Sequence, residues 1–281
     1  MTMQLHLQKV PAGNGRLWIR HGFRVFKREP LAFLGLMGLS VVALLVLAAL
    51  PFIGPALGLM AIPVGSLGFM LATHLVLQKK RPTAAVFVAP LRLTRERRNH
   101  QLMLGASFAL IASIILALAN GIDGEATRAV LELMKNEGSP EDFAKAASDP
   151  RILYGTLARF GGLALLSVPY WHAPALIHWG GQGVGQALFS STLAMWRNKA
   201  AFALNGLLWF ALFLGLSSAI TLVFTMLGLL QAAPLVMLIT GMLTWAVFYA
   251  SLYFSFVDCF MFGAPEDVLD EPRDSPADRG D

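Results

Sequence analysis

Six long apolar stretches constrain the fold of this chain more than any other feature of its sequence. A helix of about 20 apolar residues crosses the roughly 30 Å hydrocarbon core of a bilayer, and the backbone must be helical there because lipid satisfies no N–H or C=O group. The stretches cover residues 31–50, 56–77, 102–119, 152–177, 201–230 and 235–262. We therefore expect an all-α membrane protein with six transmembrane helices, in which residues 1–262 form a single membrane domain.

Composition supports lipid, rather than water, as the solvent of this domain. Of the 281 residues, 56% are hydrophobic and only 14% are charged, whereas soluble domains are about 25% charged. The single cysteine, Cys259, excludes an intramolecular disulfide and any site built from several cysteines. Residues 263–281 are acidic and poor in apolar side chains, so we expect a disordered cytoplasmic tail there.

The lysines and arginines predict how the helices are oriented. Seventeen lie before the first stretch, between the second and third, between the fourth and fifth, and in the tail, whereas five lie between residues 128 and 159. Basic segments stay on the cytoplasmic side of a bacterial inner membrane, so we expect both termini in the cytoplasm. Residues 120–150 then form a periplasmic segment, which either caps the bundle or is a solvated spacer. Because the basic residues flank apolar stretches, we do not expect nucleic acid as a partner.

Amphipathic segments precede three of the apolar stretches. In each segment, apolar residues share one face of a helix and basic residues occupy another. The apolar faces are formed by Ile19, Phe23 and Phe26, by Phe87 and Leu91, and by Phe189, Leu193 and Trp196. We expect three units, each consisting of a cationic amphipathic in-plane helix followed by a transmembrane hairpin.

The basic residues of these segments are candidates for binding lipid headgroups. A helix of this kind lies at the membrane surface, where each Lys or Arg contributes about 1 kcal/mol of attraction to anionic lipid. The candidates are Arg16, Arg20, Arg24, Lys27, Arg92, Arg95, Arg98, Arg197 and Lys199. Under the alternative interpretation, the segments only fix the topology and tilt of the helices that follow them.

Four ionisable residues within the apolar stretches are candidates for a shallow polar vestibule. Such residues are expensive in a membrane and are functional candidates for that reason. They are His74, His172, His178 and Asp258, and each lies toward the cytoplasmic end of a helix that returns to that side. The structural alternative is that they reach the headgroups or hydrogen-bond a neighbouring carbonyl.

Signatures of catalysis and of metal binding are missing from the sequence. His172 and His178 are six positions apart, which separates them by about 120° around a helix. The chain has no G-x-S-x-G motif, and the glycines of GGQGVGQ lack the G-K-[ST] ending of a phosphate loop. We therefore expect no enzymatic activity, no metal and no cofactor.

Several segments together resemble a known protein family. They are the opening LQKVPAGNGRLWIRHGFRVFKREPLAFLGL, the PFIGP turn, the GFM run at residues 68–70, and QALFSSTLAMWRN. These segments are similar to a family of uncharacterised integral inner-membrane proteins of Gram-negative bacteria, and the similarity extends to about Phe262. The resemblance implies an inner-membrane location and a six-span topology, and it implies no catalytic residue.

These observations favour a non-enzymatic accessory or scaffold protein of the inner membrane. We expect it to bind anionic lipid or a membrane-protein partner, which includes a second copy of the chain. The alternative is a small transporter or permease component. A transporter ordinarily carries more polar residues near the bilayer midplane than Asn205, Thr221 and Thr240.

Overall fold

The structure is a computed structural model that describes residues 6–136 and 139–260. The predicted disordered tail at residues 263–281 lies outside the described residues. Every regular element within the described ranges is helical. The α-helices are α1 (Asn14–Arg28), α2 (Pro30–Ala48), α3 (Gly54–Leu77), α4 (Ala85–Val88), α5 (Arg95–Lys135), α6 (Pro140–Ala147), α7 (Pro150–Tyr170), α8 (Ala173–Gly180), α9 (Val184–Arg197), α10 (Lys199–Met226) and α11 (Ala233–Phe260), and 3₁₀ turns cover Ala89–Arg92 and Leu230–Ala232.

Six segments of the described chain are long and apolar enough to cross a membrane, which matches the number predicted. They are α2, α3, α5, α7 with α8, α10, and α11 with the 3₁₀ turn before it. Two of them differ in detail from the prediction. The third has 41 residues and continues as a helix to Lys135, so it includes much of the segment predicted as a connection. At about 1.5 Å per residue it is about 60 Å long, which exceeds the thickness of the hydrocarbon core.

The fourth segment is broken where the sequence suggested a continuous stretch. α7 ends at Tyr170 and α8 starts at Ala173, so Trp171 and His172 separate two helices. Pro174 explains this break, because a proline has no N–H group to donate to the carbonyl four residues earlier, that of Tyr170, and its ring clashes with that carbonyl. Pro174 therefore lies in the first turn of α8, a position that needs no intrahelical N–H donor.

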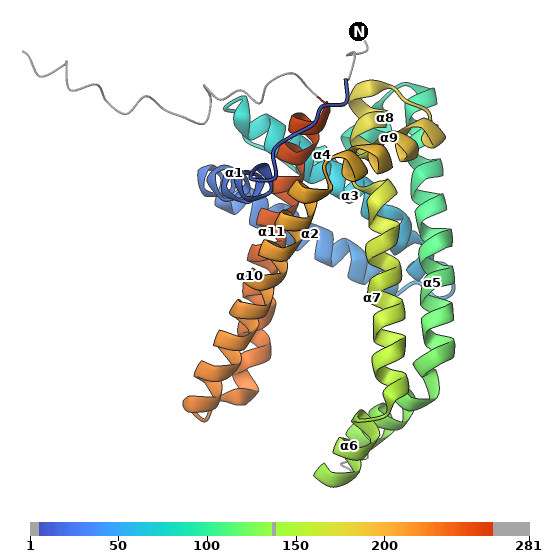
Figure 1. The fold of residues 1–281 in the computed structure, drawn as a ribbon, viewed down its shortest axis with the longest axis vertical. Coiled ribbons are helices and arrows are strands. Elements are labelled where there is room, and N and C mark those ends of the chain that lie inside the picture. The colour runs from blue at the N-terminus through green and yellow to red at the C-terminus, as the bar shows by residue number, and fades with distance from the viewer. Residues whose placement is uncertain (1–5, 137–138, 261–281) are drawn as a thin grey trace, which may run out of the picture.

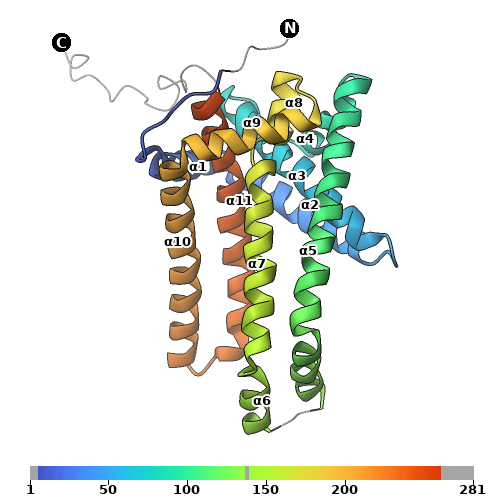
Figure 2. The ribbon, with the colours of Figure 1, turned by 45° about the vertical axis from the view of Figure 1, so that its right-hand side comes forward.

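The long helices form two legs that are joined at one end (Figures 1 and 2). One leg consists of α5 and α7 and the other of α10 and α11, and in both legs the two helices pack against each other. α1, α8 and α9 lie where the legs meet, and α9 runs across the top of α7 to the start of α10 (Figure 2). We call the end at which the legs meet the basic end. It comprises α1, α4, α8, α9 and the first turns of α5. α6 lies at the opposite end of the first leg.

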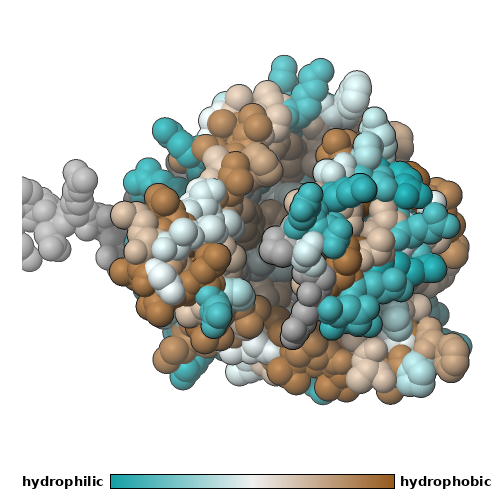
Figure 3. Space-filling view, turned by 90° about the horizontal axis from the view of Figure 1, so that it is seen from below, coloured by the Kyte–Doolittle hydropathy of each residue, from teal (hydrophilic) through white to brown (hydrophobic). Residues whose placement is uncertain are grey.

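Buried apolar residues concentrate near the basic end. The largest fully buried side chains include Trp18, Phe33, Leu67, Leu176 and Phe256. Away from that end the legs expose apolar side chains, such as Phe160 on α7 and Phe210 on α10. Viewed from the opposite end, hydrophilic residues gather over the leg that carries α6, and the surface is hollowed between the two legs (Figure 3). Such exposure is expected of helices that are solvated by lipid.

Candidate functional site

α1 is fastened to the bundle through a stripe of small and apolar residues. Gly15, Trp18, Gly22 and Val25 are buried at the alternating three- and four-residue spacing of one helix face. A Cβ atom added at Gly15 would overlap the carbonyl oxygen of Ala201, so only glycine permits this approach to α10. Gly22 is similarly close to α11, where a Cβ would meet Ser251. The hydropathy and charge patterns did not reveal this stripe, although its heptad spacing was a readable signal.

Hydrogen bonds to Asp258 fix the position of α1 along α11. The Asp258 carboxylate accepts from Trp18 Nε1 at 2.6 Å and from Asn14 Nδ2 at 2.8 Å. Asn205 on α10 adds a further contact, since its Nδ2 donates to the carbonyl oxygen of Gly15 at 3.0 Å. Asp258 and Asn205 therefore have a positioning role.

The attachment of α1 leaves its predicted cationic face pointing outward. Arg16, Arg20 and Lys27 are exposed, and Arg24 is half-buried. The predicted apolar face lies beside the buried stripe rather than on it. Phe26 packs against Phe33, and Phe23 stacks on Trp209 while keeping part of its ring exposed. α1 thus has three faces: the buried stripe that packs against the bundle, the aromatic face beside it, and the cationic face that points outward.

α9 repeats part of this arrangement at the junction of the two legs. Ala187, Ser191 and Ala194 are buried against the bundle. Phe189 and Trp196 point outward and are 67% and 72% exposed. Lys199 Nζ lies 5.4 Å from the centre of the Trp196 ring, a cation–π contact, and Arg197 is exposed beside it. An aromatic ring beside a cation is typical of the membrane–water interface.

The middle segment differs from the predicted amphipathic helix. Its helical part is limited to α4, with four residues, and a 3₁₀ turn of four residues. Pro90 in that turn accounts for the short length, because it cannot donate an intrahelical hydrogen bond. Arg92, Arg95 and Arg98 are nevertheless exposed, and the latter two lie in the first turn of α5.

Two of the four segments that carried the family resemblance, the amino-terminal one and QALFSSTLAMWRN, meet at Asn198. The Asn198 side chain donates from Nδ2 to the carbonyl oxygen of Gln8 at 3.0 Å and accepts at Oδ1 from Val10 N at 2.9 Å. The N–H groups of His6 and Gln8 donate to carbonyls of Phe260 and Cys259 in the last turn of α11. The last carbonyls of a helix are those that need partners from outside it, so these two bonds from the amino-terminal segment cap α11.

Two of the four predicted vestibule residues share aromatic neighbours. The rings of His74 and His178 lie 6.0 and 5.1 Å from the Trp179 ring, measured between ring centres. Gln78 Nε2 donates to His74 Nε2, so the proton of this imidazole is on Nδ1 and is donated to the Tyr253 hydroxyl at 2.9 Å. These contacts occur at the basic end, where α3, α8 and α11 meet.

The third histidine, His172, is a core residue. It is fully buried, and its ring packs against Phe202, Phe256 and Phe260. Ser255 Oγ donates its proton to the carbonyl oxygen of Leu252, so His172 Nε2 is the donor in its 3.0 Å contact with Ser255. The arrangement holds the break between α7 and α8 against α11 and leaves no access from the surface.

Arg97 and Gln101, which the sequence patterns did not single out, join α5 to α8. Arg97 Nη1 donates to the carbonyl oxygen of His178, and Gln101 Nε2 donates to that of Pro174. Arg97 and Gln101 are four residues apart on α5, and Pro174 and His178 are four residues apart on α8. One face of each helix therefore supplies the contacts. Such tertiary contacts leave no mark in hydropathy, and only the i, i+4 spacing hints at them.

Polar contacts at the opposite end tie α5 to α7. Arg159 binds Asp123 through two parallel hydrogen bonds of 2.9 and 3.1 Å, and the Asp123 side chain is only 2% exposed. Gly155 provides the space, since a Cβ there would overlap the Asp123 carboxyl group. Asp123 belongs to the predicted periplasmic segment at residues 120–150, yet the two charges lie within packed helices and neutralise each other.

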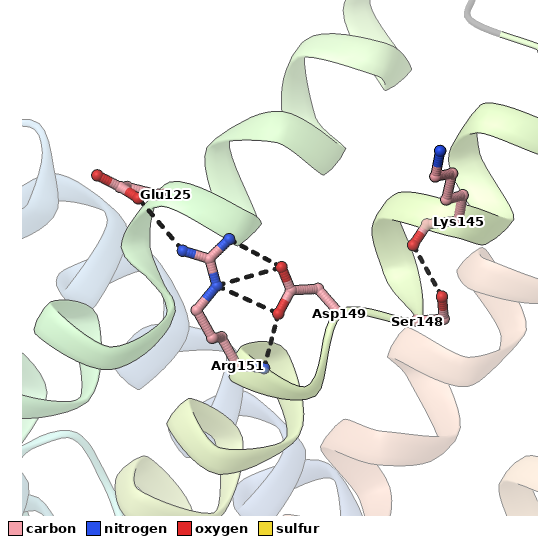
Figure 4. A network of polar contacts seen from close by, with 5 residues as sticks. All are labelled: Glu125, Lys145, Ser148, Asp149 and Arg151. Carbon is pink, nitrogen blue, oxygen red and sulfur yellow. Dashed lines mark hydrogen bonds and ion pairs between the residues drawn. The ribbon is translucent and has the colours of Figure 1, made fainter.

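A second ionic cluster lies at the start of α7 (Figure 4). Arg151 contacts Asp149 and Glu125, and Asp149 Oδ1 also accepts from the Arg151 backbone N–H at 2.8 Å, which caps the helix. The side-chain hydrogen bond from Arg151 lowers the pKa of Asp149 below its ordinary value of 3.8. Because the cluster is exposed, its ion pairs add little to the stability of the whole fold, and its main effect is to cap the first turn of α7.

This combination of elements defines a class of protein. Six long apolar helical segments, fastened by buried polar contacts and flanked by basic residues at one end, are those of a multi-pass α-helical membrane protein. Within the described part of the chain, no group of three or more His, Cys, Asp or Glu residues is placed to hold a metal ion.

Comparison with known proteins then gives the family. Over 257 residues the chain is 30% identical to Probable inner membrane protein BTH_II0599 of Burkholderia thailandensis, and the alignment covers 91% of this chain and 94% of that protein. The chain belongs to this family and is a multi-pass protein of the inner membrane, as the resemblance implied. No family model matches the chain. No solved structure matches it either.

Proposed function

We propose that this protein is a non-enzymatic scaffold of the inner membrane whose basic end lies at the cytoplasmic face and binds anionic phospholipid. One observation carries the proposal. Exposed cations from three separate segments, around Arg20, Arg95 and Arg197, gather at the end where the two legs meet. Bringing them together from positions as much as 177 residues apart requires the fold, so the cationic surface is a property of the folded protein.

The chemistry of this surface suits a phospholipid. Arginine guanidinium groups bind phosphate oxygens through paired hydrogen bonds, and each basic residue near an anionic surface adds about 1 kcal/mol of attraction. Phe189 and Trp196 on α9 supply exposed aromatic surface beside these charges, which suits the boundary between headgroups and acyl chains. In this arrangement both termini are cytoplasmic, and α1, α9 and the segment that contains α4 lie among the headgroups at the cytoplasmic surface.

Native mass spectrometry of the protein with its co-purified lipid tests the proposal. The test variant is Arg20→Gln/Arg95→Gln/Arg197→Gln. The control variant, Arg128→Gln/Lys135→Gln/Lys145→Gln, removes the same number of charges from the other end. We expect the test variant to lose retained phosphatidylglycerol or cardiolipin at least tenfold while the control keeps it.

Two further readouts make this test decisive. Binding of anionic lipid to the wild type should weaken as salt rises, because the contacts are exposed and electrostatic. Phosphatidylethanolamine, which has no net charge, should be retained equally by both variants. Equal loss of anionic lipid from the test and control variants would refute binding at the basic end. The same spectra report whether a second copy of the chain or another protein accompanies the lipid.

A further inference from the structure

The α2–α3 pair does not follow the direction of the two legs. In Figures 1 and 2, which differ by a rotation about the vertical axis, this pair runs obliquely across the bundle. The turn between α2 and α3 lies well above the turn between α10 and α11 in both views, and so lies nearer the basic end. α2 has 19 residues and is therefore about 28 Å long. Such a helix crosses a hydrocarbon core of roughly 30 Å only when it stands nearly upright.

Two close contacts of α3 show its path independently of the views. Near its start, Met60 meets α5 at Gly105, where an added Cβ would lie 2.6 Å from the Met60 carbonyl oxygen. Near its end, Thr73 Oγ1 donates to the carbonyl oxygen of Ala250 on α11 at 3.3 Å. α3 therefore passes from one leg to the other between residues 60 and 73.

Both contacts lie at a similar depth below the basic end. Gly105 is ten residues from the start of α5, and Ala250 is ten residues from the end of α11. At 1.5 Å per residue each lies about 15 Å along its helix. Because both ends of this part of α3 have the same depth, α3 runs largely across the bundle, and the turn before it stays in the half of the bundle nearer the basic end.

The turn is apolar and exposed. From residue 41 to residue 65 no side chain carries a nitrogen or oxygen atom. At the tip Phe52 is 99% exposed and Ile53 is 59% exposed. A turn at the aqueous surface ordinarily consists of polar residues, as in the connection that contains α6. The exposed tip instead matches hydrocarbon surroundings.

Most of the backbone N–H groups of the turn have acceptors within the protein. Hydrocarbon offers no hydrogen-bond partner, so each N–H group of a turn that lies in it must be satisfied within the protein or costs several kcal/mol. The N–H groups of Ala49, Leu50, Ile53, Gly54 and Leu57 donate to carbonyls within the turn and its flanking residues, whereas those of Phe52 and Ala56 have no such bond. The two prolines of the turn, at positions 51 and 55, have no N–H group to satisfy.

We propose that α2 and α3 form a re-entrant hairpin, which enters and leaves the bilayer at the face where the basic end lies and holds its turn within the hydrocarbon. The proposal does not depend on lipid binding by the arginines. It leaves four crossing segments, α5, α7, α10 and α11. Both ends of the hairpin remain on the same side as in a fully crossing pair, so charge counting alone cannot distinguish the two arrangements.

Depth measurement by spin labelling tests the proposal. In full-length protein with Cys259→Ala, a nitroxide is attached at Ile53→Cys and the protein is placed in lipid nanodiscs. Reference sites are Leu214→Cys in the middle of α10, Gln231→Cys in the turn before α11 and Lys145→Cys on α6. Collision with oxygen, which concentrates in hydrocarbon, is compared with collision with a water-soluble nickel chelate.

We expect the label at position 53 to behave like that at position 214, with collisions with oxygen dominating. Nickel accessibility at position 53 equal to that at position 231 or 145 would overturn the proposal. A second comparison needs no label. Ile53→Lys should lower the folded yield in the membrane severalfold, whereas Gln231→Lys should be tolerated. Equal tolerance of both lysines would also contradict a turn buried in hydrocarbon.

Discussion

Trp18 donates its indole N–H to the carboxylate of Asp258 at 2.6 Å, and this bond joins helices α1 and α11 across 240 positions of sequence. Asp258 thereby determines where the cationic face of α1 lies relative to the legs. A carboxylate near the end of an apolar helix suggests a functional group when it is read from sequence. In the fold it is the anchor for the surface that carries the arginines.

Removing the indole donor should loosen α1. A hydrogen bond to a charged group is worth about 1.5–3 kcal/mol, so Trp18→Phe should destabilise the protein by about 2 kcal/mol. Hydrogen exchange should accelerate in the amides of α1 first. Trp245→Phe is the control, because Trp245 is 45% exposed on α11. If exchange in α1 is unchanged in Trp18→Phe, the anchoring role is wrong.

The buried pair of Asp123 and Arg159 should show strong coupling. Neutralising one partner leaves an uncompensated charge, which costs about 3–5 kcal/mol in a buried pair. We expect about 3 kcal/mol for Asp123→Asn or Arg159→Gln, because the Arg159 side chain is 29% exposed. The double variant should lose less than the sum of the single losses. Equilibrium unfolding in mixed micelles measures all three, and strictly additive losses would exclude the coupling.

Gly155 should tolerate no side chain. Gly155→Ala brings a Cβ into the space of the Asp123 carboxyl group and should cost about 1–3 kcal/mol through displacement of the ion pair. Gly161→Ala on the same helix is the matched control, because no neighbouring atom lies within 4 Å of the position that its Cβ would take. The control should be neutral or slightly stabilising, since alanine favours a helix more than glycine does. Equal stability of the two variants would contradict the close approach.

The cap of α7 should depend on pH in the acid range only. Because Arg151 lowers the pKa of Asp149, the ionised cap stabilises the helix start fully above pH 3.8, and this contribution is lost as the pH falls through the lower folded-state pKa. The first amides of α7 should therefore lose protection from hydrogen exchange, corrected for intrinsic exchange rates, once the pH is lower than about 4. Asp149→Asn keeps an acceptor oxygen and should abolish this pH dependence. A cap that weakens between about pH 5 and 7 would point to another group.

Hydropathy predicted the long helices because their apolar character is summed over about 20 residues, and a few exceptions do not change the sum. The positions of basic residues such as Arg20 and Arg95 were likewise readable, since charge avoids hydrocarbon wherever the chain is placed. The length of α5 was underestimated, because its charged continuation after residue 119 is helical without being apolar.

Contacts between distant residues were not predictable from this one sequence. The hydrogen bonds from the Asn198 side chain to the backbone of Gln8 and Val10 could not be predicted, since an asparagine near the end of a helix is compatible with many local structures. The oblique path of α3 depends on Gly105 and Ala250, which have ordinary neighbours in sequence. Periodicity describes one helix at a time, whereas these features belong to pairs of helices.

The most direct test of the account is cysteine labelling in intact cells, because every functional proposal for the basic end assumes that it faces the cytoplasm. Arg95→Cys and Lys145→Cys are introduced separately with Cys259→Ala, and cells are treated with a membrane-impermeant maleimide. We predict labelling at position 145 in intact cells and labelling at position 95 only after the inner membrane is permeabilised. Labelling at position 95 in intact cells, with position 145 protected, would contradict the account.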